Sequence, residues 1–137
     1  MVITRNSKKK NNLKVLIVDD ALLVVERLAE TISELECVSQ VAVATGYDEA
    51  IGLIISGKPD IVLLDIHLPE KSGIEILKFV KKSHPGVITV MLTNQSSYNY
   101  KILCEQLGSD HFVDKSSEFE NIPEIIESYS SIRKQKL

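Results

Sequence analysis

A short uninterrupted apolar run, Ile61-Val62-Leu63-Leu64, constrains the fold of this chain more than any other feature of its sequence. The turn-forming residues Lys58-Pro59-Asp60 precede the run, and Asp65 follows it directly. An apolar run of this length between turn residues is typical of a strand buried on both faces, as in parallel sheets. Open α/β sheets bind ligands beyond the carboxyl ends of their strands, so Asp65 stands where a ligand is expected.

Apolar runs alternate with helical spacings along the rest of the chain. Strands are predicted at residues 13–18, 37–43, 61–64, 87–92 and 110–113. Helices are predicted after Asp20, from Tyr47 to residue 56, from Ile74 to just before His84, weakly over 96–107, and near the C-terminus. Five strands alternating with five helices predict a three-layer α/β fold with an all-parallel sheet covered on both faces. In the doubly wound, flavodoxin-like order 2-1-3-4-5, the first and third strands are neighbours.

Residues that favour N-caps stand before several of these helices. Asp19-Asp20 precedes the first helix and Ser72 precedes the third. For the last helix the spacing of a capping box occurs twice, as Ser117 with Glu120 and as Asn121 with Glu124. We choose Asn121, because Pro123 then falls in the first turn, where proline is tolerated, and not in the helix interior.

Length and composition are those of one ordinary globular domain. The chain has 137 residues, of which 44% are hydrophobic and 26% are charged. Its apolar runs are far shorter than a membrane span and no apolar signal segment follows Met1, so we expect a cytoplasmic protein. Cys37 and Cys104 are too few and too far apart for a disulfide framework or a zinc site, and we expect both to be buried, reduced thiols.

Positive charge is concentrated at the N-terminus. Residues 1–12 carry four basic residues and no acidic one, a charge of +4, so a chain with a net charge of −3 carries −7 over the remainder. Four charges without aromatic residues are weak evidence for nucleic-acid or membrane binding, and we expect a disordered, solvated tail. The globular domain is expected to cover residues 13–133, with a short tail at 134–137.

Polar residues stand at the carboxyl ends of four of the predicted strands. They are Asp19 and Asp20 after the first strand, Asp65 after the third, Thr93 after the fourth and Lys115 after the fifth. Neighbouring strands lie about 4.8 Å apart, so the three carboxylates are predicted to share one crevice. Lys115 starts two strands, or roughly 10 Å, from Asp65, and its flexible side chain can cover much of that distance.

Three carboxylates this close repel one another and require a cation. Ligands that are all oxygen favour Mg²⁺ over softer metals. A divalent cation and Lys115 would offset the charge of a phosphoryl group on Asp65, and Thr93 would donate its hydroxyl to the phosphoryl oxygens. The carboxylate of Asp65 is the natural nucleophile, so the residues point to phosphoryl transfer through an aspartyl phosphate.

Over about residues 13–133 the chain resembles the response-regulator receiver domains of two-component signalling. The resemblance rests on Asp19-Asp20, on Lys58-Pro59-Asp60 with Asp65-x-x-Leu68-Pro69-x-x-Ser72-Gly73, on Thr93, and on Gly108-x-Asp110-x-Phe112-x-x-Lys115. It implies that Asp65 is the phosphoacceptor and that Lys115 contacts the phosphate. It also implies that Thr93 and Phe112 form a switch pair. The ligands of Mg²⁺ would be Asp19, Asp20, Asp65 and the backbone carbonyl of His67. The family usually has proline after this lysine, often with a cis peptide bond. Here Ser116 follows, and because a cis bond before serine costs about 3 kcal/mol we expect a trans bond.

The resemblance implies a signalling switch that catalyses only its own phosphoryl transfer and dephosphorylation. The chain would accept a phosphoryl group from a histidine kinase or a histidine phosphotransfer protein and bind a downstream effector, as a monomer or a phosphorylation-dependent dimer. The conformational change is expected on the face formed by 96–107, 110–113 and 121–133, because the weak apolar stripe of 96–107 fixes that helix poorly. We expect either a stand-alone, chemotaxis-regulator-like receiver that signals by binding or an output domain outside this chain.

Three other functions compete with this one. A receiver-like module could act by contact without phosphorylation, although the acids, the threonine and the lysine are all present. Phosphatases that form an aspartyl phosphate typically carry a second acid two residues after the nucleophile, where this chain has His67. A nucleotide-binding module would need a glycine-rich loop after the first strand, where Asp19-Asp20 would repel phosphate.

Overall fold

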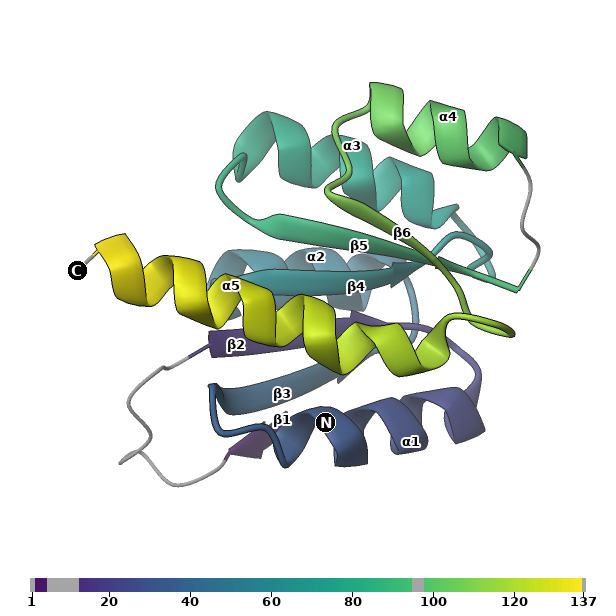
Figure 1. Cartoon of the computed structure of the whole chain (residues 1–137). Helices are drawn as coiled ribbons and strands as arrows, with labels where there is room; N and C mark the ends of the chain where they lie inside the picture. The colour runs from purple at the N-terminus through teal and green to yellow at the C-terminus, as the bar shows by residue number, and fades with distance from the viewer. Residues whose placement is uncertain (1, 5–12, 95–97, 137) are drawn as a thin grey trace.

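The computed structural model of the chain describes residues 2–4, 13–94 and 98–136. Its strands are β1 (Val2–Thr4), β2 (Leu13–Val18), β3 (Val38–Ala44), β4 (Ile61–Asp65), β5 (Ile88–Thr93) and β6 (His111–Asp114). Its α-helices are α1 (Leu22–Ser33), α2 (Tyr47–Gly57), α3 (Gly73–Ser83), α4 (Tyr98–Gln106) and α5 (Ile122–Lys136), with a 3-10 turn, η1 (Phe119–Asn121), before α5. The strands form one sheet in the order β1-β3-β2-β4-β5-β6, with helices on both sides (Figure 1).

The five predicted strands pair in parallel, and their order is the predicted 2-1-3-4-5 when counted from β2. The predicted five-stranded parallel sheet is confirmed, and one further strand extends it: β1 pairs antiparallel with β3 through Val2–Ala42, Ile3–Val41 and Thr4–Gln40. The prediction of a disordered tail over 1–12 is therefore wrong for Val2–Thr4, and residues 1 and 5–12 lie outside the described residues. Three residues are too few to show the period-2 pattern from which strands are predicted.

The central strands are buried on both faces because each face has its own hydrophobic core. In β2, Val15 and Ile17 pack with α1 and α5, whereas Leu16 and Val18 pack with α2, α3 and α4. Alternate residues of β4 divide between the two cores in the same way. This explains the uninterrupted apolar run before Asp65, since neither face of the strand meets water.

The helix ends agree with most of the predicted capping signals. Ser72 caps α3 by accepting a hydrogen bond from the backbone N–H of Ile74, and α5 begins after Asn121 with Pro123 in its first turn. The predicted aspartate cap of α1 is wrong: the N-cap is Ala21, because the Asp19 carboxylate accepts the N–H of Ala21 before the helix begins. The last helix also continues to Lys136, past the predicted domain end at 133.

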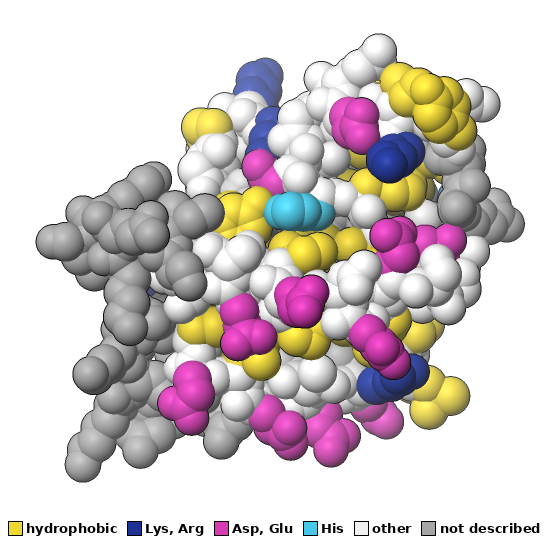
Figure 2. All heavy atoms as spheres, viewed as in Figure 1, with side chains coloured by type: hydrophobic (Ala, Val, Ile, Leu, Met, Phe, Trp, Pro, Cys, Tyr) yellow, Lys and Arg dark blue, Asp and Glu magenta, His cyan; other side chains and the backbone are white. Residues whose placement is uncertain are grey.

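Acidic side chains are common on the face shown in Figure 2, where α1 and α5 lie. Glu26 and Glu30 of α1 and Glu124 and Glu127 of α5 are exposed. Cys37 and Cys104 are both buried thiols, as predicted. Among the described helices none is long and apolar enough to cross a membrane.

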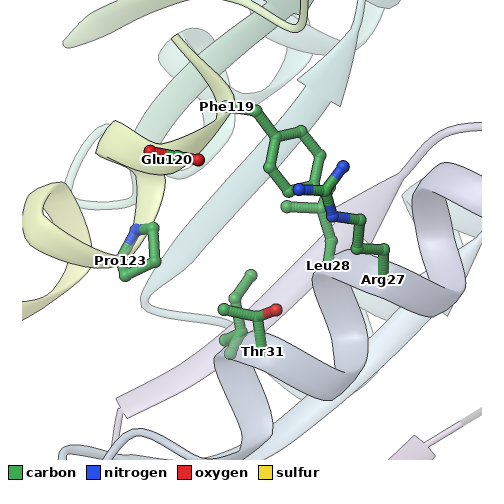
Figure 3. A pocket seen from close by; sticks show the side chains of 7 residues that line it. Arg27, Leu28, Thr31, Phe119, Glu120 and Pro123 are labelled. Carbon is green, nitrogen blue, oxygen red and sulfur yellow. The ribbon is translucent and has the colours of Figure 1, made fainter.

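A groove of about 160 Å³ separates α1 from the start of α5 (Figure 3). It is lined by Arg27, Leu28, Thr31, Ile32, Phe119, Glu120 and Pro123. The guanidinium of Arg27 lies 4.4 Å from the centre of the Phe119 ring and partly covers the groove. Asp19, Asp20, Asp65, Thr93 and Lys115 do not line this groove, which is therefore distinct from the residues at the strand ends.

Candidate functional site

Three carboxylates meet where β2 and β4 end side by side. The two strands pair in parallel up to Val18 and Leu64, so the next residues along each strand, Asp19 and Asp65, emerge at the same edge. One carboxylate oxygen from each of Asp19, Asp20 and Asp65 lies within 4.8 Å of the others. Asp19 is fully buried and Asp65 is 6% exposed, whereas Asp20 is open to solvent. The structure thus brings together the three acids that the strand order predicted to share a crevice.

Lys115 extends into the same crevice from the end of β6. Its ammonium lies 2.8 Å from Asp19 Oδ2 and 3.6 Å from Asp65 Oδ2, and its side chain is almost fully buried. The flexible side chain therefore covers the distance across β5, as expected. One ammonium faces three carboxylates, which leaves an excess of negative charge at a site with an exposed acid at its rim. Such a set of oxygen ligands fits a hard divalent cation.

The surroundings of Asp65 disfavour its ionised form. Burial and the nearby charge of Asp19 raise the pKa of the Asp65 carboxyl above its ordinary value, and Asp20 acts in the same direction. The ammonium of Lys115 and the backbone N–H of His67, which donates to Asp65 Oδ1 at 3.3 Å, oppose this effect without cancelling it. A positive ion beside the carboxylates would remove most of the cost.

The loop between β4 and α3 is fastened directly beneath Asp65. The hydroxyl of Ser72 donates to the carbonyl of Ile66 at 3.1 Å, and the N–H of Gly73 donates to the same carbonyl at 2.8 Å. The backbone here comes so close to the strand that a Cβ on Gly73 would overlap the carbonyl oxygen of Asp65. Glycine is therefore required at 73 by contact and not by its backbone angles, a reason that the sequence alone does not give.

Thr93, Phe112 and His67 surround the acidic crevice. Thr93 ends β5, is fully buried, and accepts the N–H of Lys115 at its carbonyl with a distance of 2.7 Å. Phe112, on the adjacent strand β6, is half-buried against the core beneath α4. The exposed ring of His67 meets the ring of Tyr100 on α4 edge to face, with 5.4 Å between ring centres. The edge-to-face contact links the loop after Asp65 to α4.

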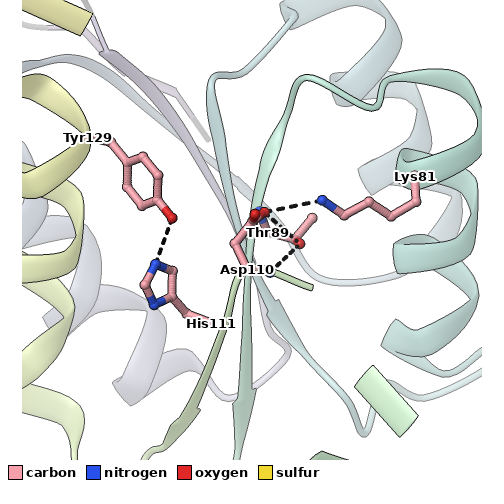
Figure 4. Close-up of polar contacts among 5 residues, drawn as sticks. All are labelled: Lys81, Thr89, Asp110, His111 and Tyr129. Atoms are coloured by element: carbon pink, nitrogen blue, oxygen red, sulfur yellow. Dashed lines mark hydrogen bonds and ion pairs between the residues drawn. The ribbon is translucent and has the colours of Figure 1, made fainter. Parts of the chain in front are cut away.

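Polar contacts on both faces of the sheet fix β6, the strand that leads to Lys115 (Figure 4). At its start, Asp110 Oδ2 accepts the N–H of Thr89 on β5 at 2.9 Å and the ammonium of Lys81 on α3 at 3.1 Å. On the other side of the sheet, His111 Nε2 lies 2.7 Å from the hydroxyl of Tyr129 on α5. The strand is thereby tied to a helix on each face before it reaches the crevice.

The turn after Lys115 has its own hydrogen bonds. The Lys115–Ser116 peptide bond is trans, as predicted. Asp114 Oδ1 accepts the N–H of Ser116 at 2.8 Å, and the N–H of Asp114 donates to Glu118 Oε1 at 3.1 Å. Sequence reasoning missed the part played by Asp114 and Glu118. The only signal was an aspartate next to the lysine, with a second acid four residues later.

Gly73→Ala should lower the free energy of unfolding by about 1–3 kcal/mol, because the added methyl group forces the loop away from Asp65. Chemical denaturation monitored by circular dichroism measures this. Gly86→Ala is the matched control, since a Cβ there meets no atom within 4 Å. Equal stability of Gly73→Ala and the control would contradict the close approach seen at Gly73.

The raised pKa of Asp65 has a consequence for stability against pH. A carboxyl whose pKa is higher in the folded state contributes stability below its ordinary value of 3.8, and this contribution is lost as the pH rises through the folded value. At neutral pH without divalent cations, Asp65→Asn should therefore melt at a higher temperature than wild type. The difference should shrink as the pH falls towards 3.8. A variant that is less stable than wild type at neutral pH would contradict the prediction.

Comparison with known proteins places this arrangement in a family. Residues 15–127 match the model of the response regulator receiver domain. The response regulator domain of a Thermotoga maritima CheB is 26% identical, with a TM-score of 0.76 over 86% of this chain and 93% of that one. A LuxR-family two-component response regulator from Aurantimonas is 25% identical, with a TM-score of 0.80 over 88% of this chain and 86% of that one.

A third structure shows the fold at lower identity. The CheY-like receiver domain protein of Methanospirillum hungatei is 23% identical and superposes with a TM-score of 0.82 over 93% of this chain and all of that one. The family match spans the strands that carry Asp19, Asp65, Thr93 and Lys115. The chain belongs to the response regulator receiver domains of two-component signalling.

Proposed function

We propose that this receiver domain is a phosphorylation-dependent switch whose phosphoacceptor is Asp65. The observation that carries the proposal is the position of the Asp65 carboxylate: 3.6 Å from a buried ammonium, beside two further acids, at the mouth of the crevice. A histidine kinase or a histidine phosphotransfer protein would supply the phosphoryl group. Receiver domains act as signalling modules, and the chain would change its affinity for a downstream effector protein.

The transfer is a simple displacement at phosphorus. A carboxylate oxygen of Asp65 attacks the phosphorus of a phosphohistidine, and the bond between phosphorus and the donor's ring nitrogen breaks. The electron pair of that bond stays on the ring nitrogen, and the donor leaves as neutral imidazole because its other ring nitrogen carries a proton. Negative charge then rests on the phosphoryl oxygens, close to the ammonium of Lys115.

The residues at the site fit Mg²⁺ as cofactor. Asp19, Asp20, Asp65 and the backbone carbonyl of His67 would hold the ion. Bound there, Mg²⁺ would offset negative charge on the phosphoryl oxygens. Because the carboxylate of Asp20 is exposed, an ion entering from solvent would meet it first. The buried carboxylate of Asp19 already pairs with the ammonium of Lys115.

The relay of the signal would begin at Thr93 and Lys115. Both would gain bonds to the phosphoryl group that are absent before phosphorylation, and such differential contacts are what shifts a conformational equilibrium. Phe112 would turn inward when Thr93 moves towards the phosphate. The responding face would be α4, β6 and the start of α5. Only Cys104 is fully buried within α4, so packing fixes this helix less firmly than its neighbours.

Two alternatives are less well supported. A module that acts by contact alone would not need Lys115 buried between Asp19 and Asp65. Removing these charges from water is unfavourable, and their ion pairs contribute little to the stability of the fold. An aspartyl-phosphate phosphatase would need a second acid where His67 stands. The ring of His67 points instead to Tyr100.

Incubation with acetyl phosphate and Mg²⁺ should add one phosphoryl mass to the wild type, and Asp65→Asn should lose this gain because it lacks the nucleophilic oxygen. Intact-protein mass spectrometry measures both. Asp20→Ala should need a higher Mg²⁺ concentration for the same gain, whereas Asp60→Ala, an acid at the opposite end of the strand, should not. A full gain of mass by Asp65→Asn would show that the phosphoacceptor is another residue.

Lys115→Ala should accept phosphate but fail to relay it, because Mg²⁺ would offset much of the entering charge while the lysine bond to phosphate would be lost. Hydrogen exchange over 98–114, compared with and without beryllofluoride, should change in wild type and in the control Lys78→Ala but not in Lys115→Ala. Circular dichroism checks that the variant folds, since Asp19 loses its buried partner. A folded Lys115→Ala that accepts no phosphate at all would contradict this division of roles.

A further inference from the structure

The outer surface of α2 carries no charge along most of its length. From Ala50 to Gly57 the helix has no charged residue. Ile55 is 54% exposed, and Ile51, one turn earlier on the same side of the helix, is partly buried. On the other side of the sheet, α1 and α5 carry exposed glutamates, although α1 also exposes Leu22 and Leu23. A helix face that meets only water normally carries charged residues.

Gly52 lies on this surface, three residues before Ile55. A glycine inside a helix destabilises it relative to alanine. A Cβ at Gly52 would meet no atom within 4 Å, so no contact among the described residues requires glycine there. An exposed isoleucine and an unneeded glycine on one helix face are both unfavourable for the isolated chain. Both become favourable if another backbone packs closely against this face.

The two ends of α2 carry opposite charges. Asp48 is exposed in the first turn, and Lys58 is exposed at the C-cap. Neither side chain forms an ion pair with another described residue. When two copies of this helix lie antiparallel, each lysine comes to the end where its partner's aspartate stands. The helix dipoles also oppose each other in this arrangement.

We propose that the outer face of α2 is an interface for a second copy of this chain, with the two α2 helices packed antiparallel across a two-fold axis. Gly52 would let the backbones approach, Ile51 and Ile55 would be buried, and Asp48 would pair with Lys58 of the partner copy. A two-fold axis uses the same patch twice, as the opposite charges at the two ends require. Val2, which is 50% exposed and shares its sheet face with α2 through its pair Ala42, extends the apolar surface.

The interface is small, and its dimer is weak. Eleven residues of helix span about 16 Å, so the buried area falls in the class of weak, transient contacts. The face lies on α2, away from β6 and α5, and it needs neither phosphate nor Asp65. Asp65→Asn should therefore dimerise as wild type does, which separates this proposal from the proposed phosphorylation.

Sedimentation velocity over a concentration series tests the proposal. Wild type should show a reversible monomer–dimer equilibrium, and Ile55→Lys should weaken it by about tenfold or more. Leu23→Lys is the matched control, because Leu23 is 83% exposed on α1 across the sheet and should change nothing. A wild type that stays monomeric at every concentration would overturn the proposal. So would a dimer that Ile55→Lys leaves intact.

Two further variants give results that a general loss of folding cannot imitate. Gly52→Ala should raise the melting temperature of the monomer and yet weaken the dimer, since the helix is strengthened while the close approach is blocked. Asp48→Lys and Lys58→Glu should each weaken the dimer, and the double variant should restore it, because the exchanged charges meet again across the axis. A stable Gly52→Ala that dimerises as wild type does, or a double variant weaker than both single ones, would overturn the antiparallel arrangement.

Discussion

Crowding of negative charge at one edge of the sheet is the constraint on which the rest of the structure depends. Two adjacent strands end in aspartates because parallel strands bring their carboxyl ends to one edge. Burial makes this arrangement costly, which is why the pKa of Asp65 is raised and why a lysine from β6 reaches across β5 to Asp19. The ammonium of Lys115 only partly balances the three carboxylates, and the remaining negative charge is what a bound cation would offset under the proposed function.

The tight backbone around the crevice follows from the same constraint. Charges that repel one another stay close only if the surrounding loops hold them there. Each loop is tied by short hydrogen bonds: Asp19 to the N–H of Ala21, Ile66 to Ser72 and Gly73, and Asp114 to Ser116. Rigid loops on the acid side contrast with α4, which has only one fully buried residue. Under the proposed function, a phosphoryl group at this site would therefore act on the helix that packing holds least firmly.

The sequence was most informative where burial dictates the residue type. The apolar runs of β2 and β4 predicted strands buried on both faces, and the acids after them predicted a shared crevice. The predictions failed where the determining contact involves backbone or very short segments. The strand at Val2–Thr4 is too short to show a hydrophobic period. The Asp19 carboxylate accepts the N–H of Ala21 and does not cap α1. The need for glycine at 73 comes from the carbonyl of Asp65. None of these has a signature in residue type alone.

The short strand β1 changes how this sheet meets other proteins. A bare strand edge exposes a row of unpaired N–H and C=O groups, on which stray extended chains can assemble into aggregates. In this chain β1 pairs antiparallel with β3 from Gln40 to Ala42 and covers that edge. Because β1 is only three residues long, its own outer edge is short. A strand from another protein could pair with only these three residues, which is too short for stable pairing. By covering the edge of β3, β1 thus reduces the strand edge on which aggregates could form.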